Sequence, residues 1–283
     1  MKRQITLRLK EQPSLPVEAE SITPENLSGK SLDQIYRLPL WSGNRETRLT
    51  DYFEVDMAEL EGEEHPDQES LARIVMRGDL SRFKRLGQGM RAGEMEIHGP
   101  VGFHAGAGME GGSLLIRGNA GDWLGAHMKG GNIIVEGSTG HFTGAAYRGK
   151  VQGMTGGTIL IKGDVGQMAG SRMRRGLMAV GGDCGDFLGF KMLAGTIILA
   201  GRGGSWIGAN MRRGTIILFK TMDLLPSFYY NCLYRPVFWG LLRQELERKG
   251  FLATNCCPDG FFKRFSGDAQ EGGRGEILIC QSN

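Results

Sequence analysis

The stretch that decides the fold is GDWLGAHMKGGNIIVEG, residues 121–137, in which five glycines surround an apolar alternation typical of a β-strand. Glycine is abundant throughout the chain, at 46 of 283 residues, about twice its usual share of roughly 7%. A flexible linker would not carry Trp123, Ile133 and Val135. The neighbouring sequence explains the pattern, because this stretch is one copy of a repeat.

The other copies are VGFHAGAGMEGGSLLIRG, VGQMAGSRMRRGLMAVGG, CGDFLGFKMLAGTIILAG and GGSWIGANMRRGTIILF. Equivalent glycines lie at Gly102, Gly121, Gly140, Gly166, Gly185 and Gly204, with spacings of 19, 19, 26, 19 and 19, and one methionine recurs in each copy from Met90 to Met211. The longer interval holds a seven-residue insertion near AAYRGKVQG, between Gly144 and Met154. A fixed period near 20 with strand-like segments indicates a solenoid of about seven coils between residues 80 and 219.

Each copy ends in an alternating run whose paired apolar residues share one face of a strand. Stacking would bury these pairs, which are Met95/Ile97, Leu114/Ile116, Ile133/Val135, Ile159/Ile161, Met178/Val180, Ile197/Leu199 and Ile216/Leu218. Glycine suits the corners because it adopts positive φ without a Cβ penalty. A period of 19 is not a multiple of six, which argues against a left-handed β-helix built from hexapeptide repeats. Neither a leucine-rich repeat pattern nor a collagen pattern is present. The sequence predicts a mainly β protein built on a right-handed parallel β-helix.

Two further rows follow the repeat. The row of large side chains is predicted to stack in the core, with an aromatic sugar-binding strip on the outer wall as the alternative; it comprises His104, Trp123, Phe142, Met168, Phe187 and Trp206. The middle residue of each strand faces outward, and six of the seven are apolar: Glu96, Leu115, Ile134, Leu160, Ala179, Ile198 and Ile217. An apolar outer strip predicts a cover, either the chain's own C-terminal helix or a partner subunit.

The ends of the chain lack the glycine-rich repeat. Three parts are therefore expected: an α/β N-terminal cap over residues 1–73, the β-helix over 74–219 and an α/β extension over 220–283. Residues 4–11 alternate like a strand. SITPENLSG and GKSLDQIYR predict short capped helices, and Ser31 and Gln34 have capping-box spacing. PLWSGNRETRLTDYFEV predicts two strands around a turn, and EVDMAELEGEEHPDQE a solvated acidic loop. PVFWGLLRQELERKG predicts a helix with Phe238, Leu241, Leu242 and Leu246 on its apolar face, followed by a strand, GEILIC.

Composition argues against several functional classes. A net charge of +3 gives no general affinity for nucleic acid. The start, MKRQITLRLKEQP, resembles neither a signal peptide nor an anchor, and no apolar run is long enough to span a membrane. Five cysteines, including Cys256 and Cys257, form no CxxC pair and no disulfide framework, which suits a reducing cytoplasm.

The search for an active site finds no recognisable motif. The five histidines, His65, His98, His104, His127 and His141, occupy different places in the repeat and have no metal-ligand spacing. The G-x-G strings lack the context of a dinucleotide site and are repeat corners. No catalytic residue, no metal ligand and no motif-bound cofactor is therefore predicted.

Basic residues gather at the methionine corner: Arg172, Arg174, Arg175, Lys191, Arg212 and Arg213, with Arg148 and Lys150 on the insertion. Arg174 and Arg175 follow Met173 as Arg212 and Arg213 follow Met211, so the two pairs should lie on one face, two coils and about 10 Å apart. A solvated basic face and an anion-binding face are both compatible with this pattern.

The repeats together with both ends resemble a known family. KEQPSLPVEAESITPENLSGKSL, TDYFEVD, AYRGKVQGMTGGTILIKG and FFKRFSGDAQEGGRGEIL look like the C subunit of formylmethanofuran dehydrogenase, over nearly the whole chain. The repeat is shared with the C-terminal domain of the glutamate synthase large subunit, but LKEQPSLPVEAE and YRGKVQGMTGG match the former. LLRQELERKGF and GDAQEGGRGEIL look more like the bacterial version, from the formyltransferase/hydrolase complex of methylotrophs.

The resemblance implies a scaffold subunit of a cytoplasmic one-carbon complex. Its partners would be formyltransferase and metal-dependent hydrolase subunits, which carry the catalysis and move formyl groups between tetrahydromethanopterin and a furan-type carrier with release of formate. The polyglutamate tail of a methanofuran or methylofuran carrier is anionic, so the resemblance makes the tail, or an acidic partner surface, a ligand for the basic corner. The alternatives are a detached glutamate synthase-like domain and a stand-alone polysaccharide-binding β-helix protein.

Overall fold

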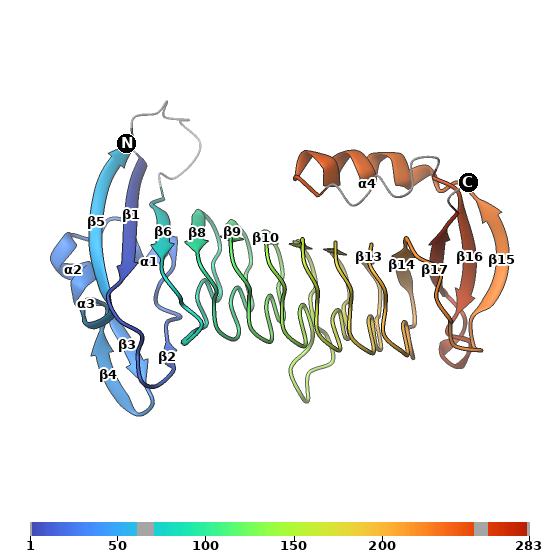
Figure 1. Ribbon diagram of the computed structural model, residues 1–283, viewed down its shortest axis with the longest axis horizontal. Helices are drawn as coiled ribbons and strands as arrows, with labels where there is room; N and C mark the ends of the chain where they lie inside the picture. The colour runs from blue at the N-terminus through green and yellow to red at the C-terminus, as the bar shows by residue number, and fades with distance from the viewer. Residues whose placement is uncertain (1, 61–70, 252–259, 282–283) are drawn as a thin grey trace.

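A computed structural model describes residues 2–60, 71–251 and 260–281. The protein is mainly β, with one large sheet and few helices (Figure 1). In its described part the large sheet has the order β15-β16-β17-β14-β13-β12-β11-β10-β9-β8-β6-β1-β5. Its strands are β1 (Lys2–Leu9), β5 (Phe53–Leu60), β6 (Arg73–Arg77), β8 (Glu94–His98), β9 (Ser113–Ile116), β10 (Asn132–Val135), β11 (Thr158–Ile161), β12 (Leu177–Val180), β13 (Thr196–Leu199), β14 (Gly214–Leu218), β15 (Tyr229–Tyr234), β16 (Phe262–Gly267) and β17 (Gly275–Cys280).

The predicted repeat strands are β8 to β14, and they pair in parallel with each repeat position on its equivalent. Ile133 of β10, for example, lies between Leu114 of β9 and Ile159 of β11. A second parallel ladder of single bridges joins Leu80, Val101, Ala120, Thr139, Val165 and Cys184 in successive coils. Figure 1 shows the coils side by side along the long axis, with the insertion projecting from one of them. The insertion is accommodated without disturbing this register.

The core runs along the inside of the coils. Both inner residues of β10, Ile133 and Val135, are fully buried, as are their equivalents in the other repeat strands. The repeat methionines from Met90 to Met211 are at most 1% exposed, and they form part of the same continuous cluster. The predicted inner row is therefore confirmed.

Two glycines of the opening stretch show why the corners need this residue. Gly125 has φ of +58°, and a Cβ there would lie 2.7 Å from Cδ1 of Ile159 in the next coil. At Gly130 a Cβ would collide with the carbonyl oxygen of Glu110 in the preceding coil. Coils separated by about 4.8 Å leave no space for a side chain that points along the stacking direction.

The predicted burial of the aromatic row is wrong. His104, Trp123, Phe142, Met168 and Phe187 are only half-buried, and Trp206 is 54% exposed. All six have φ between 62° and 66°, a left-handed conformation that turns the following residue inward instead. The buried row is Ala105, Leu124, Thr143, Ala169, Leu188 and Ile207.

Stacking between coils stabilises this outer row. The rings of Trp123 and Phe142 lie 4.3 Å apart and 8° from parallel, and those of Phe187 and Trp206 lie 6.0 Å apart at 10°. A left-handed residue costs about 1–2 kcal/mol, and an aromatic pair contributes about 0.5–1.5 kcal/mol, so stacking offsets part of the backbone strain. The row lies on the outer wall, as the alternative prediction placed it, and Trp206 at its end keeps more than half of its surface exposed.

The outer apolar strip is covered by the chain itself over most of its length. Helix α4 (Val237–Arg248) lies along the coils in Figure 1, and a second apolar cluster joins Leu160, Ile198 and Ile217 of the strip to Trp239 and Leu246 of α4. Of the two predicted covers, the C-terminal helix is thus the correct one from β11 to β14. Leu115 and Ile134, nearer the N-terminus, stay half-buried.

The predicted apolar face of α4 is only partly right. Leu246 is fully buried and Leu242 packs against the second cluster, but Phe238 is 39% and Leu241 73% exposed. Trp239 packs edge-on against Phe219 and Phe262 instead, at 5.7 and 5.2 Å. Contact with the end of the sheet therefore rotates the helix away from the face that its own sequence favours.

The N-terminal region closes the other end of the sheet. Strand β1 pairs antiparallel with β5 and parallel with β6. The predicted helices are α1 (Pro24–Leu27), capped by Thr23, and α2 (Leu32–Tyr36), with the Ser31–Gln34 capping box present. A smaller sheet in the order β4-β3-β2-β7 contains the predicted pair β3 (Pro39–Ser42) and β4 (Arg45–Arg48), with β2 (Val17–Glu18) and β7 (Phe83–Lys84).

Two predictions for the ends need correction. The segment expected to start a solvated acidic loop is strand β5 up to Leu60, because its backbone pairs with β1; residues 61–70 lie outside the described residues. The short helix α3 (Leu49–Tyr52) was not predicted. In the C-terminal part, the predicted strand GEILIC is β17, and it continues the parallel ladder by pairing with β14. No helix in the described ranges is long and apolar enough to cross a bilayer.

Substitutions at two adjacent residues should show that the inner and outer faces of β10 contribute differently to stability. Ile133→Asp places a charge among fully buried side chains and should destabilise the protein by about 4 kcal/mol or more, because no partner compensates the charge. Ile134→Asp, on the half-buried outer face, should cost much less. Thermal unfolding of the two variants checks this order, and equal losses would contradict it.

Candidate functional site

The predicted basic residues lie on neighbouring coils at one corner. The backbone N–H of Arg174 donates to Met154, that of Leu193 to Met173, and that of Arg212 to Met192. Arg174 and Arg212 therefore occupy one row, two coils apart. Arg174, Arg175, Arg212 and Arg213 are all exposed, so their side chains are accessible from solvent.

The residue before each methionine forms a second basic row. Arg172 and Lys191 both have positive φ, 58° and 53°, and the N–H of Arg172 donates to Phe190 at 2.8 Å, next to Lys191. Nη1 of Arg172 also donates to the carbonyl oxygen of Lys150 at 2.8 Å. This bond brings the insertion, with exposed Arg148 and Lys150, to the same corner.

Not every cation of the corner is available to a ligand. Arg212 forms an ion pair with Glu271 (Nε to Oε2, 2.9 Å), an acid supplied by the short helix η2 (Ala269–Glu271). The ammonium group of Lys191 lies over the ring of Phe190 at 5.2 Å. Arg174, Arg175 and Arg213 have no ion pair within the described residues. Among the described residues, Arg172, Lys191, Arg148 and Lys150 have no ion pair either, so all seven cations contribute to the excess of positive charge at this corner.

Tyr147 anchors the insertion to the coils. Its hydroxyl lies 2.9 Å from Nδ1 of His104, and its N–H donates to Nε2 of His127 at 2.9 Å. Its ring also packs 5.0 Å from that of Trp123. Burial lowers the pKa of both histidines and raises the pKa of Tyr147, so all three groups are held neutral. The cluster fixes the insertion beside Arg172.

The sequence alone did not reveal this anchor. The 26-residue interval located the insertion, but not that its tyrosine would contact two histidines from two preceding coils. Only the stacking register brings His104, His127 and Tyr147 together. An aromatic residue at the start of an insertion was the one available signal.

A buried carboxylate elsewhere is fully engaged. Glu96 is 8% exposed and accepts from Arg73 and from Nε of Arg117, the latter at 2.7 Å, with Nε2 of His98 at 3.0 Å. Burial acts to raise the pKa of Glu96, but the hydrogen bonds from the two arginines outweigh it and the pKa lies below the ordinary 4.5. An ionised, fully paired carboxylate is poorly suited to general acid–base catalysis.

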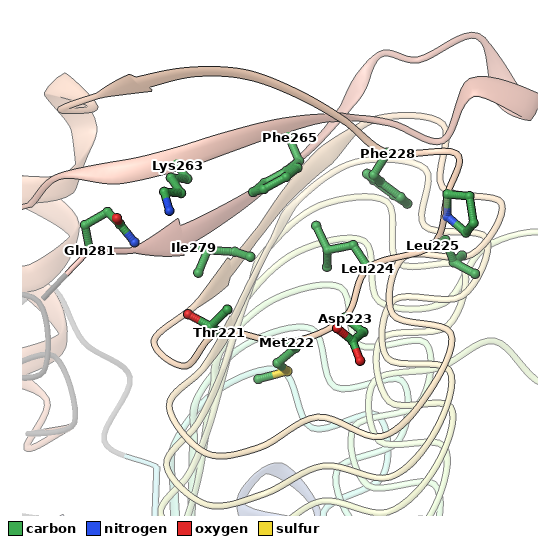
Figure 2. A pocket seen from close by; sticks show the side chains of 11 residues that line it. Thr221, Met222, Asp223, Leu224, Leu225, Phe228, Lys263, Phe265, Ile279 and Gln281 are labelled. Atoms are coloured by element: carbon green, nitrogen blue, oxygen red, sulfur yellow. The ribbon is translucent and has the colours of Figure 1, made fainter.

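One cavity of about 340 Å³ opens between the chain segment after β14 and the C-terminal strands. Figure 2 shows its walls, formed mainly by apolar side chains such as Leu224, Phe228 and Phe265. Lys263 and Asp223 are its charged side chains, and they lie on different sides in Figure 2. They do not converge on one point, so the cavity lacks a catalytic arrangement.

Metal and thiol chemistry find no support in the described ranges. No group of three or more histidines, cysteines or acids gathers there that could hold a metal ion. Cys184 is buried, and burial raises its pKa to about 11. His65, Cys256 and Cys257 lie outside the described residues. Cys280 is disulfide-bonded, which the cysteine spacing did not predict, because spacing does not show which cysteines meet in space.

Comparison with known proteins places the chain in a family. The GXGXG motif family matches residues 80–231, more than half of the chain. The C subunit of the tungsten-containing formylmethanofuran dehydrogenase 2 of Methanothermobacter thermautotrophicus is 38% identical over 103 residues. The chain belongs to the family of formylmethanofuran dehydrogenase C subunits. The C subunit of the molybdenum-containing enzyme 1 of Methanosarcina barkeri is 36% identical over 101 residues.

The two matches to C-subunit sequences cover only part of each protein. They span 36% of this chain, and 36% and 32% of the respective relatives. A solved structure matches far more: a chain in the crystal structure of the formyltransferase/hydrolase complex (FhcABCD) from Methylorubrum extorquens in complex with methylofuran. It superposes with a TM-score of 0.86 at 34% identity, over 98% of this chain and 100% of that one.

The Glu96 cluster gives a pH-dependent prediction. Glu96→Gln should destabilise this member of the C-subunit family by about 1–3 kcal/mol at neutral pH, because two arginines lose their anionic partner. Since the pKa of Glu96 is lowered by folding, the wild-type advantage is present above the ordinary carboxyl pKa and disappears as the pH falls through the folded value. Unfolding measured from pH 7 down to pH 3 checks this; a difference independent of pH would contradict it.

Proposed function

We propose that the chain is the C subunit of a cytoplasmic formyltransferase/hydrolase complex and acts as its scaffold. Partner subunits would move formyl groups between tetrahydromethanopterin and a furan-type carrier and release formate. The observation that carries this proposal is the full-length likeness to a chain of the Methylorubrum extorquens complex. The relatives from formylmethanofuran dehydrogenases match about a third of their own length, so the hydrolytic version is favoured over the redox version.

The geometry suits a scaffold. We propose that the coiled body is a right-handed parallel β-helix, a form consistent with its two parallel ladders. Such a body is rigid because every coil is hydrogen-bonded to the next at the strand and again at the corner. It therefore holds the basic corner, the insertion and helix α4 at constant separations, as a docking platform requires.

Native mass spectrometry tests the scaffold proposal. When the protein is purified gently from its own cells, we expect it in one particle with formyltransferase and hydrolase subunits. A chain recovered only as a lone monomer would falsify the scaffold role. The same particle should release formate from formylated carrier.

We also propose that the basic corner holds the polyglutamate tail of a methanofuran- or methylofuran-type carrier. Guanidinium groups bind carboxylates in bidentate fashion, and exposed arginines recur two coils, about 10 Å, apart. The solved relative contains methylofuran. Arg174, Arg175 and Arg213 would supply exposed guanidinium groups, with the charges of Arg172, Lys191 and Lys150 beside them. Arg212, held by Glu271, would contribute less.

The triple variant Arg174→Ser, Arg175→Ser, Arg213→Ser tests the corner. The fold should remain intact because these side chains are exposed, whereas carrier retention should fall by about 5–100-fold at low salt. The difference should shrink at high salt as charges are screened. Carrier content of the purified complex is the measurement.

The matched control is Arg212→Ser, which removes an arginine that already has an internal partner. It should reduce carrier retention much less than the triple variant. If the triple variant retains full carrier content and normal subunit stoichiometry, the corner is only a solvated face.

A further inference from the structure

Lys263 of β16 occupies a position that is apolar in every coil of the repeat. Leu199 of β13 pairs with Leu218 of β14, Leu218 pairs with Ile279 of β17, and Ile279 pairs with Lys263. Traced the other way, the same row passes through one buried apolar residue in each coil as far as Ile97. Paired residues of adjacent strands share one face, so a lysine ends a row of otherwise apolar inner residues.

The rest of β16 keeps the inner apolar pattern. Phe265 lies opposite Ile277, which in turn pairs with Ile216 of β14, and Phe265 packs against the main core cluster. Lys263 is therefore a single departure on an inner strand face. Its side chain is exposed, and within the described ranges no carboxylate forms an ion pair with it.

This lysine lines the cavity of about 340 Å³ next to the C-terminal strands. Gln281 follows Ile279 by two residues, so it lies on the same face as Lys263 and diagonally across from it. Figure 2 shows both side chains at one end of the cavity. Nε2 of Gln281 donates to the carbonyl oxygen of Cys280 at 3.4 Å and carries a second N–H. One end of the cavity thus offers an ammonium group and an amide donor.

The remaining walls suit an apolar body. Phe228 and Ile279 are 7% and 3% exposed, and Leu224 and Phe265 are half-buried against the core. A volume of about 340 Å³ is within the range of small-molecule sites, which begins at roughly 300 Å³. Asp223 lies on a different side from Lys263 in Figure 2, where it would repel a second anionic group. The cavity therefore favours a ligand with a single acidic group.

We propose that this cavity binds a small organic acid, with its carboxylate at Lys263 and Gln281 and its apolar body against Phe228 and Phe265. A carboxylate accepts strong hydrogen bonds from an ammonium group, and the apolar walls gain by excluding water from the body of the ligand. The ligand also accounts for the lysine, because departures from a local pattern are expected at functional sites. The site is independent of the proposed scaffold role and of the basic corner.

A matched pair of probes tests the site on the full chain. We expect 2-naphthoate to bind about fivefold or more tightly than 2-naphthamide, which has nearly the same shape without the charge. Lys263→Met should lower the affinity for 2-naphthoate to that for the amide and leave amide binding unchanged. The melting temperature should not fall, because methionine continues the apolar inner row. Isothermal titration calorimetry and thermal unfolding are the measurements.

The control is Lys220→Met, which removes an exposed lysine that does not line the cavity and should leave both affinities unchanged. Thr221 is exposed and lines the cavity, so Thr221→Trp should fill part of it without unfolding the chain and weaken both probes. Equal affinities of the two probes, or equal effects of Lys263→Met and Lys220→Met, overturn the proposal. Binding that survives Thr221→Trp lies elsewhere and overturns it too, as does the absence of binding at about 1 mM probe.

Discussion

The hydrogen-bonded ladder between successive coils is the constraint on which the rest of the structure depends. Each coil, of 19 residues or of 26 where the insertion lies, places every repeat position on its equivalent in the next coil, about 4.8 Å away. At that distance a side chain directed along the axis collides with the neighbouring backbone, as at Gly130. Glycine at the corners and apolar pairs in the strands are two consequences of one spacing.

The same ladder determines what the outer surfaces present. Left-handed residues at the corner direct aromatic rings outward, where equivalents from adjacent coils stack face to face. Beside them, side chains also continue from coil to coil: Oδ1 of Asp122 accepts from the N–H of His141, and Oδ1 of Asp186 from that of Ser205. A residue type that recurs at one repeat position therefore forms a row along the coils, whether it is aromatic, acidic or basic.

Rows of this kind favour binding over catalysis. A catalytic site needs different groups converging on one point, whereas stacked coils line up similar groups at regular intervals. The basic corner has this repeating character, with Arg174 and Arg175 two coils from Arg213, and this regularity is the reason for proposing a regularly charged chain as its ligand. Departures from the repeat, the insertion held by Tyr147 and the helix α4, add surfaces that differ from these rows.

The sequence by itself determined the period, the strands and the inner faces. These features were predictable because they are local along the chain. An alternation of apolar residues buries one face wherever the strand lies, and a fixed period places equivalent residues of successive coils next to each other. The capping box at Ser31 and the strand GEILIC near the C-terminus were visible for the same reason.

Only the tertiary structure decided which way the corner rings point, which face of α4 is buried and which arginines are free. The sign of φ at Trp123 depends on the coil above and below it, so the row of large side chains was wrongly assigned to the core. Trp239 is buried because Phe219 and Phe262, distant in sequence, meet it. Arg212 is neutralised by Glu271, 59 residues away. Each of these outcomes depends on contacts between segments that come together only when the coils have stacked. Local sequence patterns therefore do not predict these contacts.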